Sequence, residues 1–363
     1  MSRWQIPAEG GHMEKNEGIY FQNMTNLDVK ERLKKNDVIL IPIGSTENHG
    51  PDAPYGEDTY LETRMCEQVA LATGCTVAQP IWYGSHPYQH LGMPGTIMIP
   101  EEILADYIVY VMAGFWNTGF RKMVLVNGHG QDYVIPLAIH KFGKKFQVPA
   151  IAVYPHLWHV AKQELADQEH GGNYTKHLPH ACEVEQSWSM CMFPDLCRPE
   201  DAVETQGTPL FPAGHIDYAD ELGINGPIKW YNALGNCGME VICTPEGVIG
   251  NPKLASVEKG RKGCEATMDY LEKLVNDILE KYPAGELPPI DLVTMRKRED
   301  IEAVIKGPTN GGRHIYTLTY LYTWKNKRRK QSMKTIAARM YGPHDLRVEE
   351  IELPALKPNQ ILI

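Results

Sequence analysis

The apolar run Val38–Ile43, which leads directly into a loop rich in glycine and proline, constrains the fold of this chain most strongly. An uninterrupted apolar strand is typical of a parallel sheet that is covered on both faces. Comparable runs follow at 76–81, 123–126 and 150–154, and longer amphipathic segments separate them. We expect these segments to be helices, and they are 61–72, 101–116 and 133–146. The alternation predicts an α/β fold, a three-layer αβα sandwich with a mostly parallel central sheet.

The composition limits what this chain does. It has 363 residues, an ordinary hydrophobic fraction of 43% and a net charge of −9. The negative charge argues against nucleic acid and anionic membranes as partners, because both are bound through Lys and Arg. No apolar segment approaches the roughly 20 residues that span a bilayer. The polar residues 1–16 do not resemble a secretory signal and the eight cysteines lack the spacing of a disulfide framework, so we expect a cytoplasmic protein.

The loop that follows the first apolar run carries two carboxylates and an imidazole, on Glu47, His49 and Asp58. In open α/β sheets, ligands bind beyond the carboxyl ends of the strands, which is where this loop is expected to lie. Carboxylate and imidazole groups together suit a divalent metal ion. The alternative is an ordinary polar turn in which the histidine caps a backbone group.

A second polar turn follows the apolar run at 123–126. It reads Asn127-Gly-His129-Gly-Gln131, and Asn-Gly is typical of a turn because both residues tolerate positive φ. Here again an imidazole stands at the carboxyl end of a strand. Unpaired buried polar groups are costly, so two strands that deliver Glu, His and Asp to one edge favour a metal centre over packing.

A third segment adds His180, Glu183 and Glu185. The apolar residues that follow predict a helix, so the two acids lie in or near its first turn. The helix dipole favours carboxylates there, which explains Glu183 without a catalytic role. For His180 and Glu185 we favour the functional interpretation, in which another part of the chain brings an imidazole and a carboxylate to the same site.

These three segments resemble the creatininase (creatinine amidohydrolase) family. The family motif Glu-x-His-Gly-x-His-x-Pro-x-x-x-Asp is matched by Glu47, His49, Gly50, Pro54 and Asp58. The Asn-Gly-His motif is matched by 127–129, and the His-Ala-Gly-Glu-x-Glu-Thr-Ser segment by 180–187. Two positions depart from the pattern: Asp52 replaces the second histidine of the first motif, and Gln131 stands where creatininase has a metal-binding Glu. The resemblance implies a creatininase-like fold.

The resemblance also implies a centre with two divalent ions per subunit, Zn or Mn, in a homo-oligomer that is hexameric in the family. The implied ligands are Glu47, His49, Asp58, His129 and Glu185. Asp58 occupies the family's bridging position. The fifth ligand stays open between Glu185 and Gln131, because the departure at 131 removes the family's own carboxylate.

The segments 4–15 and 82–94 resemble more closely one branch of the family, the 3-dehydro-scyllo-inosose hydrolases of inositol breakdown. This branch implies that metal-activated water opens a cyclic polyol diketone to a linear keto-acid. His180 is the implied proton carrier, and Glu183 is predicted as a second catalytic residue. The predicted substrate-binding residues are Ser85, His86, Tyr88, His90 and Gln131.

Other functions remain open at this stage. The same centre suits an amidohydrolase that cuts a cyclic or linear C–N amide bond, as creatininase does. A catalytically silent relative that binds a polyol is a further alternative, because of the changes at Asp52 and Gln131. A nucleotide-binding oxidoreductase is disfavoured, since no Gly-x-Gly-x-x-Gly follows any of the predicted strands.

The end of the chain differs from the rest. We expect a hydrolase domain at 1–310 and an atypical tail at 311–363. Within the tail, 333–363 resembles the first strands of a medium-chain dehydrogenase but stops long before its catalytic parts. One hypothesis is that 325–363 is read through from an intergenic gap into a neighbouring gene. The alternative is a genuine strand-rich tail.

Overall fold

The structure is a computed structural model, and it describes most of the chain in two units. The described residues are 3–4, 18–90, 92–155, 157–165, 168, 172–175, 180–209, 241–242, 244–318, 320, 333–342 and 345–353. The larger unit is Met1–Thr319 and the smaller is Tyr320–Ile363.

The larger unit is built around a four-stranded sheet whose strands are all parallel. In sheet order the strands are β2 (Thr76–Val77), β1 (Val38–Ile43), β3 (Lys122–Asn127) and β4 (Ile151–Val153). The two central strands pair along their whole length, from Val38 opposite Lys122 to Ile43 opposite Asn127. Their carboxyl ends therefore meet at one edge of the sheet, as the sequence predicts for a parallel α/β fold.

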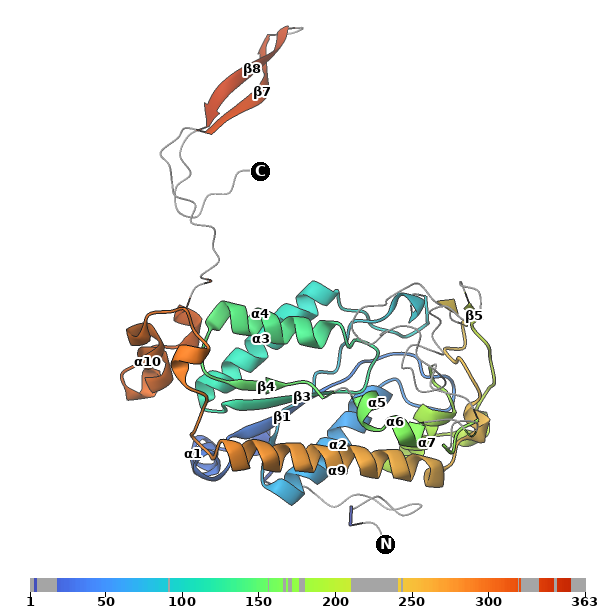
Figure 1. The fold of residues 1–363 in the computed structure, drawn as a ribbon. Coiled ribbons are helices and arrows are strands. Elements are labelled where there is room, and N and C mark those ends of the chain that lie inside the picture. The colour runs from blue at the N-terminus through green and yellow to red at the C-terminus, as the bar shows by residue number, and fades with distance from the viewer. Residues whose placement is uncertain are drawn as a thin grey trace. The chain divides into compact units, whose positions relative to one another are not determined.

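Each face of the sheet has its own apolar core, because successive residues of a strand point to opposite sides. Val38 and Leu40 lie in one core, and Ile39 and Ile41 lie in the other. The first core includes residues of α2 (Glu57–Thr73), α7 (Glu183–Met192) and α9 (Val257–Lys281), and the second includes residues of α3 (Glu101–Thr118) and α4 (Val134–Phe146). Figure 1 shows these helices on opposite faces of the sheet. The predicted αβα sandwich is confirmed.

The strand after α2 is shorter than the apolar run 76–81 predicts. Its regular pairing with β1 ends at Val77, because Pro42 of β1 has no N–H to donate toward that neighbour and Pro80 has none either. Separate bonds continue beyond the ladder: Ile81 N donates to Pro42 O, and Gly44 N donates to Ile81 O, both at 3.0 Å. The chain after β2 is therefore tied to the loop after β1.

Shorter elements complete the two units. In the larger unit they are α1 (Asn26–Lys35), α5 (Leu157–Val160), α6 (Lys162–Leu165), α10 (Arg298–Lys306), the 3-10 turn η2 (Tyr88–His90) and the antiparallel pair β5 (Thr208–Pro209) and β6 (Val241–Ile242). In the smaller unit, β7 (Met333–Gly342) and β8 (Asp345–Leu353) form an antiparallel hairpin. Among the described residues, no helix has the length and apolar character needed to cross a membrane.

Candidate metal centre

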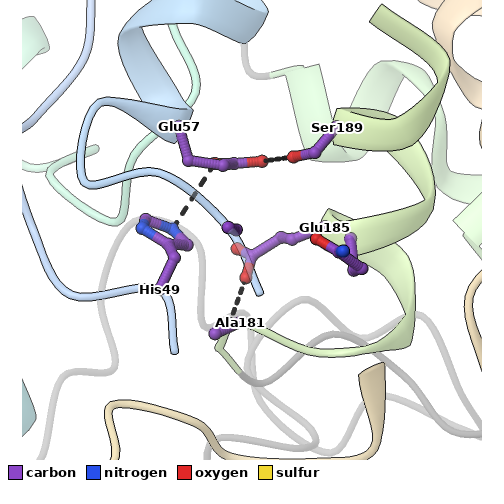
Figure 2. A pocket seen from close by; sticks show the side chains of 7 residues that line it. His49, Glu57, Ala181, Glu185 and Ser189 are labelled. Carbon is purple, nitrogen blue, oxygen red and sulfur yellow. Dashed lines mark hydrogen bonds and ion pairs between the residues drawn. The ribbon is translucent and has the colours of Figure 1, made fainter. Parts of the chain in front are cut away.

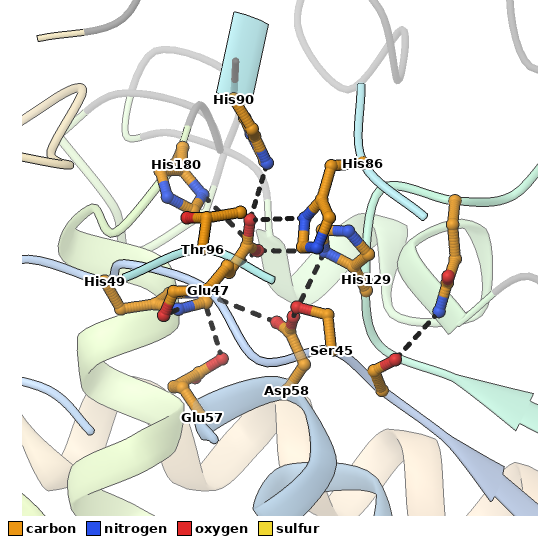
Figure 3. A network of polar contacts seen from close by, with 12 residues as sticks. Ser45, Glu47, His49, Glu57, Asp58, His86, His90, Thr96, His129 and His180 are labelled. Atoms are coloured by element: carbon orange, nitrogen blue, oxygen red, sulfur yellow. Dashed lines mark hydrogen bonds and ion pairs between the residues drawn. The ribbon is translucent and has the colours of Figure 1, made fainter. Parts of the chain in front are cut away.

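The predicted polar residues meet at the carboxyl edge of the sheet. The loop after β1 carries Glu47 and His49, the first turn of α2 carries Asp58, and the turn after β3 carries His129. All four residues are buried, with at most 2% of their surface exposed. Figure 3 shows their side chains converging from these separate segments. The sheet register that aligns β1 with β3 is what brings the two loops together.

The carboxylate of Glu47 stands among three imidazoles. Its Oε1 lies 2.9 Å from Nδ1 of His129, and its Oε2 lies 2.5 Å from Nδ1 of His90 and 3.1 Å from Nδ1 of His86. The ligand atoms of these four residues all lie within 4.8 Å of one another, a spacing that can hold a metal ion. We call this group of Glu47, His86, His90 and His129 the imidazole-rich side.

Three histidines of the site have a fixed orientation. Nε2 of His86, His129 and His180 each faces a backbone carbonyl, which can only accept a hydrogen bond, so this nitrogen carries the proton. The carbonyls belong to Ile97, Ser85 and Asn48, at 3.1, 2.8 and 2.9 Å respectively. The other nitrogen of each ring is then directed toward the carboxylate of Glu47. Histidines that ligate metals are held in this way by a partner of the second nitrogen, so the residues fit a divalent ion.

His49 faces carboxylates instead. Its Nε2 lies 3.4 Å from Glu57 Oε2, 3.4 Å from Asp58 Oδ1 and 3.7 Å from Glu47 Oε1. Asp58 links this group to the imidazole-rich side, because its Oδ2 lies 3.1 Å from His129 Nδ1. We call the group of His49, Glu57 and Asp58 the carboxylate-rich side.

The buried charges shift the titration of these groups. Burial alone lowers the pKa of His129, but the carboxylates of Glu47 and Asp58 outweigh it and hold that pKa well above its usual range. Burial raises the pKa of Glu47, and the neighbouring histidines, His129 first, outweigh it so that the pKa lies well below the usual range. Burial also raises the pKa of Glu185 to about 7, with Asp58 adding to the effect.

His180 differs from the other imidazoles. Burial lowers its pKa to about 3, and the neighbouring imidazoles of His90 and His49 contribute in the same direction. Its Nδ1 lies 4.0 Å from Glu47 Oε1, and its ring centroid lies 4.4 Å from that of His90. A neutral imidazole at this position has a lone pair on Nδ1, which can accept a proton or bind a metal ion. With Glu47 and His49, His180 forms a further group whose spacing can hold an ion.

The two predicted acids of α7 have different surroundings. Glu185 lines a small pocket with His49 and Glu57, and its Oε2 accepts a bond from Ala181 N. Glu183 accepts bonds from Lys259 Nζ at Oε1 and from Thr175 N at Oε2. Both oxygens of Glu183 are thus engaged by the scaffold, and its catalytic role remains a prediction.

The predicted substrate-binding residues do not form one group. His86 and His90 belong to the imidazole-rich side, next to Glu47. Tyr88 lies between them in sequence and has 56% of its surface exposed. Ser85 is fully buried, and its N–H donates to Gln131 Oε1 at 2.9 Å.

The side chain of Gln131 is held by hydrogen bonds to the surrounding loops. Its Nε2 donates to Gly44 O at 3.0 Å and to Asn127 Oδ1 at 2.9 Å, while its Oε1 accepts the bond from Ser85 N. It therefore joins the loops that follow β1, β2 and β3.

Sequence reasoning missed Glu57. The residue is 1% exposed and directly precedes Asp58 at the start of α2. The available signal was the pair of adjacent acids in Gly56-Glu57-Asp58, but acids in a first helical turn are common for a structural reason. Only the approach of its Oε2 to His49 distinguishes it from such a residue.

Comparison with known proteins shows which family this chain resembles. A family model described as creatinine amidohydrolase matches residues 22–275. A 3-dehydro-scyllo-inosose hydrolase of Thermotoga maritima is 54% identical over 311 residues, which cover 85% of this chain and all of that protein. The chain belongs to the creatinine amidohydrolase family. As a member it is a hydrolase.

Solved structures of the family have the same fold. A manganese form of creatininase has a TM-score of 0.57 at 21% identity, and a mutant creatininase of Zn–Zn type has a TM-score of 0.55 at 20% identity. Each match covers 73% of this chain and nearly all of the other, 99% and 98% respectively. At this identity, the likeness establishes the fold.

Proposed function

We propose that this chain is a metal-dependent hydrolase that opens 3-dehydro-scyllo-inosose, a cyclic polyol diketone, to a linear keto-acid. The observation that carries the proposal is the 54% identity to the Thermotoga maritima hydrolase over that protein's whole length. The buried cluster of Glu47, His49, Asp58 and His129 supports it, because such a donor set suits a divalent ion.

We propose Glu47, His49, Asp58, His129 and Glu185 as metal ligands. The solved creatininases of manganese and Zn–Zn type support either metal. When bound, such ions make a water molecule more acidic and polarise a carbonyl group.

The proposed reaction breaks a ring C–C bond. Water adds to one carbonyl of the diketone, and the bond to the carbon between the two carbonyls breaks. The second carbonyl takes up the electron pair as an enolate, and one proton is returned to that carbon. We assign the proton transfer to His180, because its Nε2–H is held by Asn48 O at 2.9 Å and its Nδ1 is left free.

Mass spectrometry of the products tests the proposal. The metal-loaded full-length protein is incubated with 3-dehydro-scyllo-inosose and, separately, with creatinine. We expect the diketone to gain one water and become an open-chain keto-acid, with one acid proton released. Conversion of creatinine with the diketone unchanged would instead assign the C–N amidohydrolase activity, which the family description favours. No turnover of either, with substoichiometric metal, would indicate a silent polyol-binding relative.

We also propose a cytoplasmic homo-oligomer, hexameric as the family resemblance implies. Light scattering of the purified protein measures the number of subunits directly. A monomer at micromolar concentration would contradict this assembly.

For 325–363, within the atypical tail at 311–363, we keep the read-through hypothesis as a proposal. The hairpin of β7 and β8 is consistent with the first strands of a dehydrogenase, which 333–363 resembles. The gene decides the matter: an in-frame start codon at Met333, followed by a full dehydrogenase reading frame, supports read-through. A reading frame that ends at Ile363 contradicts it.

A further inference from the structure

We propose that Glu57 is a metal ligand on the carboxylate-rich side, where it adds a carboxylate oxygen to His49 and Asp58. The inference rests on the metal dependence proposed above, but not on the identity of the substrate.

The two oxygens of Glu57 have different surroundings. Oε1 accepts a hydrogen bond from Ser189 Oγ of α7, which holds the carboxylate in place. Oε2 is directed toward His49 Nε2, 3.4 Å away, and Figure 2 shows the carboxylate between these two side chains. A residue with only a structural role at the start of α2 would need the first of these contacts and not the second.

Among the described residues, the ring nitrogen that Glu57 approaches has no hydrogen-bond partner. His49 is 2% exposed, and its Nε2 is buried without an acceptor at bonding distance. The nearest carboxylate oxygens, of Glu57 and Asp58, both lie at 3.4 Å, beyond the usual 2.7–3.2 Å of an N–H···O bond. Two ligands of a tetrahedral ion with bonds of about 2.1 Å lie about 3.4 Å apart. The spacing therefore fits atoms that share an ion better than atoms that share a proton.

Several carboxyl groups surround Glu57. It lines a small pocket with His49 and Glu185, and among the described residues that line this pocket there is no Lys or Arg. Burying several carboxylates beside a single imidazole is costly, and a divalent ion would compensate them at once.

Gln131 cannot contribute an oxygen to this side without breaking the scaffold. Its amide makes three hydrogen bonds, to Gly44, Asn127 and Ser85. Glu57 Oε2, beside Asp58 Oδ1, reaches His49 from the start of α2.

Metal content tests the role of Glu57 in the full-length protein. Glu57→Gln keeps the size of the side chain and its bond to Ser189 but replaces the carboxylate that would bind the ion by a neutral amide. After loading with Mn²⁺ or Zn²⁺ and dialysis, we expect the variant to bind one ion fewer per chain, or to bind it about 10–100-fold more weakly. Metal content and affinity equal to those of the parent would overturn the proposal.

Glu62→Gln is the matched control. Glu62 is also a buried acid of α2, with 1% exposure, and it belongs to none of the groups spaced to hold an ion among the described residues. Burial raises the pKa of Glu62 well above its usual range, as it does for Glu57, so the two substitutions replace acids in similar surroundings by an amide of the same size. We expect its metal content to match the parent.

A second variant distinguishes a metal ligand from a residue that has only a structural role. Glu57→Asp keeps a carboxyl group in the first helical turn. Its side chain is one methylene shorter, so the carboxyl oxygen lies farther from His49. A residue needed only for the helix would tolerate this change, whereas a ligand would still lose affinity. Thermal unfolding in chelator checks folding: both Glu57 variants should unfold near the parent, and only the rise in Tm on adding metal should shrink. An undiminished rise in both variants would overturn the assignment, whatever the outcome of the substrate test.

Discussion

The two sides of the candidate metal centre offer different ligand atoms. The imidazole-rich side surrounds one carboxylate, Glu47, with nitrogens of three histidines. The carboxylate-rich side surrounds one imidazole, His49, with carboxylate oxygens. Nitrogen-rich sites suit zinc, and oxygen-rich sites suit harder ions such as manganese. A single cluster can thus offer an ion two positions that differ in their ligand atoms, and Glu47 and Asp58 join these positions.

The largest effect is expected at the residue that joins the two sides. Asp58 reaches His49 with Oδ1 and His129 with Oδ2, so Asp58→Ala removes an oxygen from both. We expect metal content to fall on both sides and turnover of 3-dehydro-scyllo-inosose to drop by at least about 10³-fold. Elemental analysis and initial rates measure this. Asp106→Ala, at an exposed acid paired with Lys141, is the control and should change neither.

His180 tests whether the cluster has a member that does not bind metal. His180→Ala should lower the rate by about 10²–10⁴ while the metal stays bound, because a proton carrier is lost but no ligand. Rates and metal content are measured on the same preparation. If metal leaves in parallel with activity, His180 is a further imidazole ligand and the comparison between the two sides changes.

A pair of variants sharpens the comparison directly. His90→Ala removes a nitrogen from the imidazole-rich side, and Glu57→Gln removes an oxygen from the other. We expect the first to weaken zinc binding more than manganese binding, by about 10-fold or more, and the second to do the reverse. Competition titrations with a chromophoric chelator give the four affinities. The same ratio of affinities in both variants would show that the two sides are not distinct.

Much of this arrangement was predictable from the sequence, because short stretches of residues determine it. Buried strands such as Val38–Ile43 are recognised by their uninterrupted apolar residues, and parallel pairing places the residues after them at one edge. The gathering of Glu47, Asp58 and His129 follows from these two facts. The early end of β2 has two causes: Pro80 is visible in the run 76–81 itself, whereas Pro42 lies on the neighbouring strand and acts across the sheet.

The remaining parts depend on side-chain directions that no spacing reveals. His86 and His90 were predicted at the substrate, but the loop after β2 brings their rings to Glu47. Glu57 resembles any acid in a first helical turn until the position of His49 is known. The scaffold role of Gln131 likewise requires the three loops to be in place.

The smallest effect concerns Asp52, a further buried acid near the carboxylate-rich side. Asp52 belongs to none of the described groups spaced to hold an ion, and its buried Oδ1 has no hydrogen-bond partner. Burial raises its pKa from an ordinary value of about 4 to about 6. Since the folded pKa is the higher one, the destabilisation by this residue grows as pH rises from about 4 to about 6, and is constant above that.

Asp52→Asn removes this pH-dependent contribution and keeps the shape of the side chain. In chelator, we expect the variant to raise Tm by about 1–3 °C at pH 8 and by much less at pH 4.5. Metal content at pH 8 should equal that of the parent, because Asp52 is not a ligand. A loss of metal would extend the carboxylate-rich side to Asp52. An equal change of Tm at both pH values would show that its burial does not disfavour the charged form.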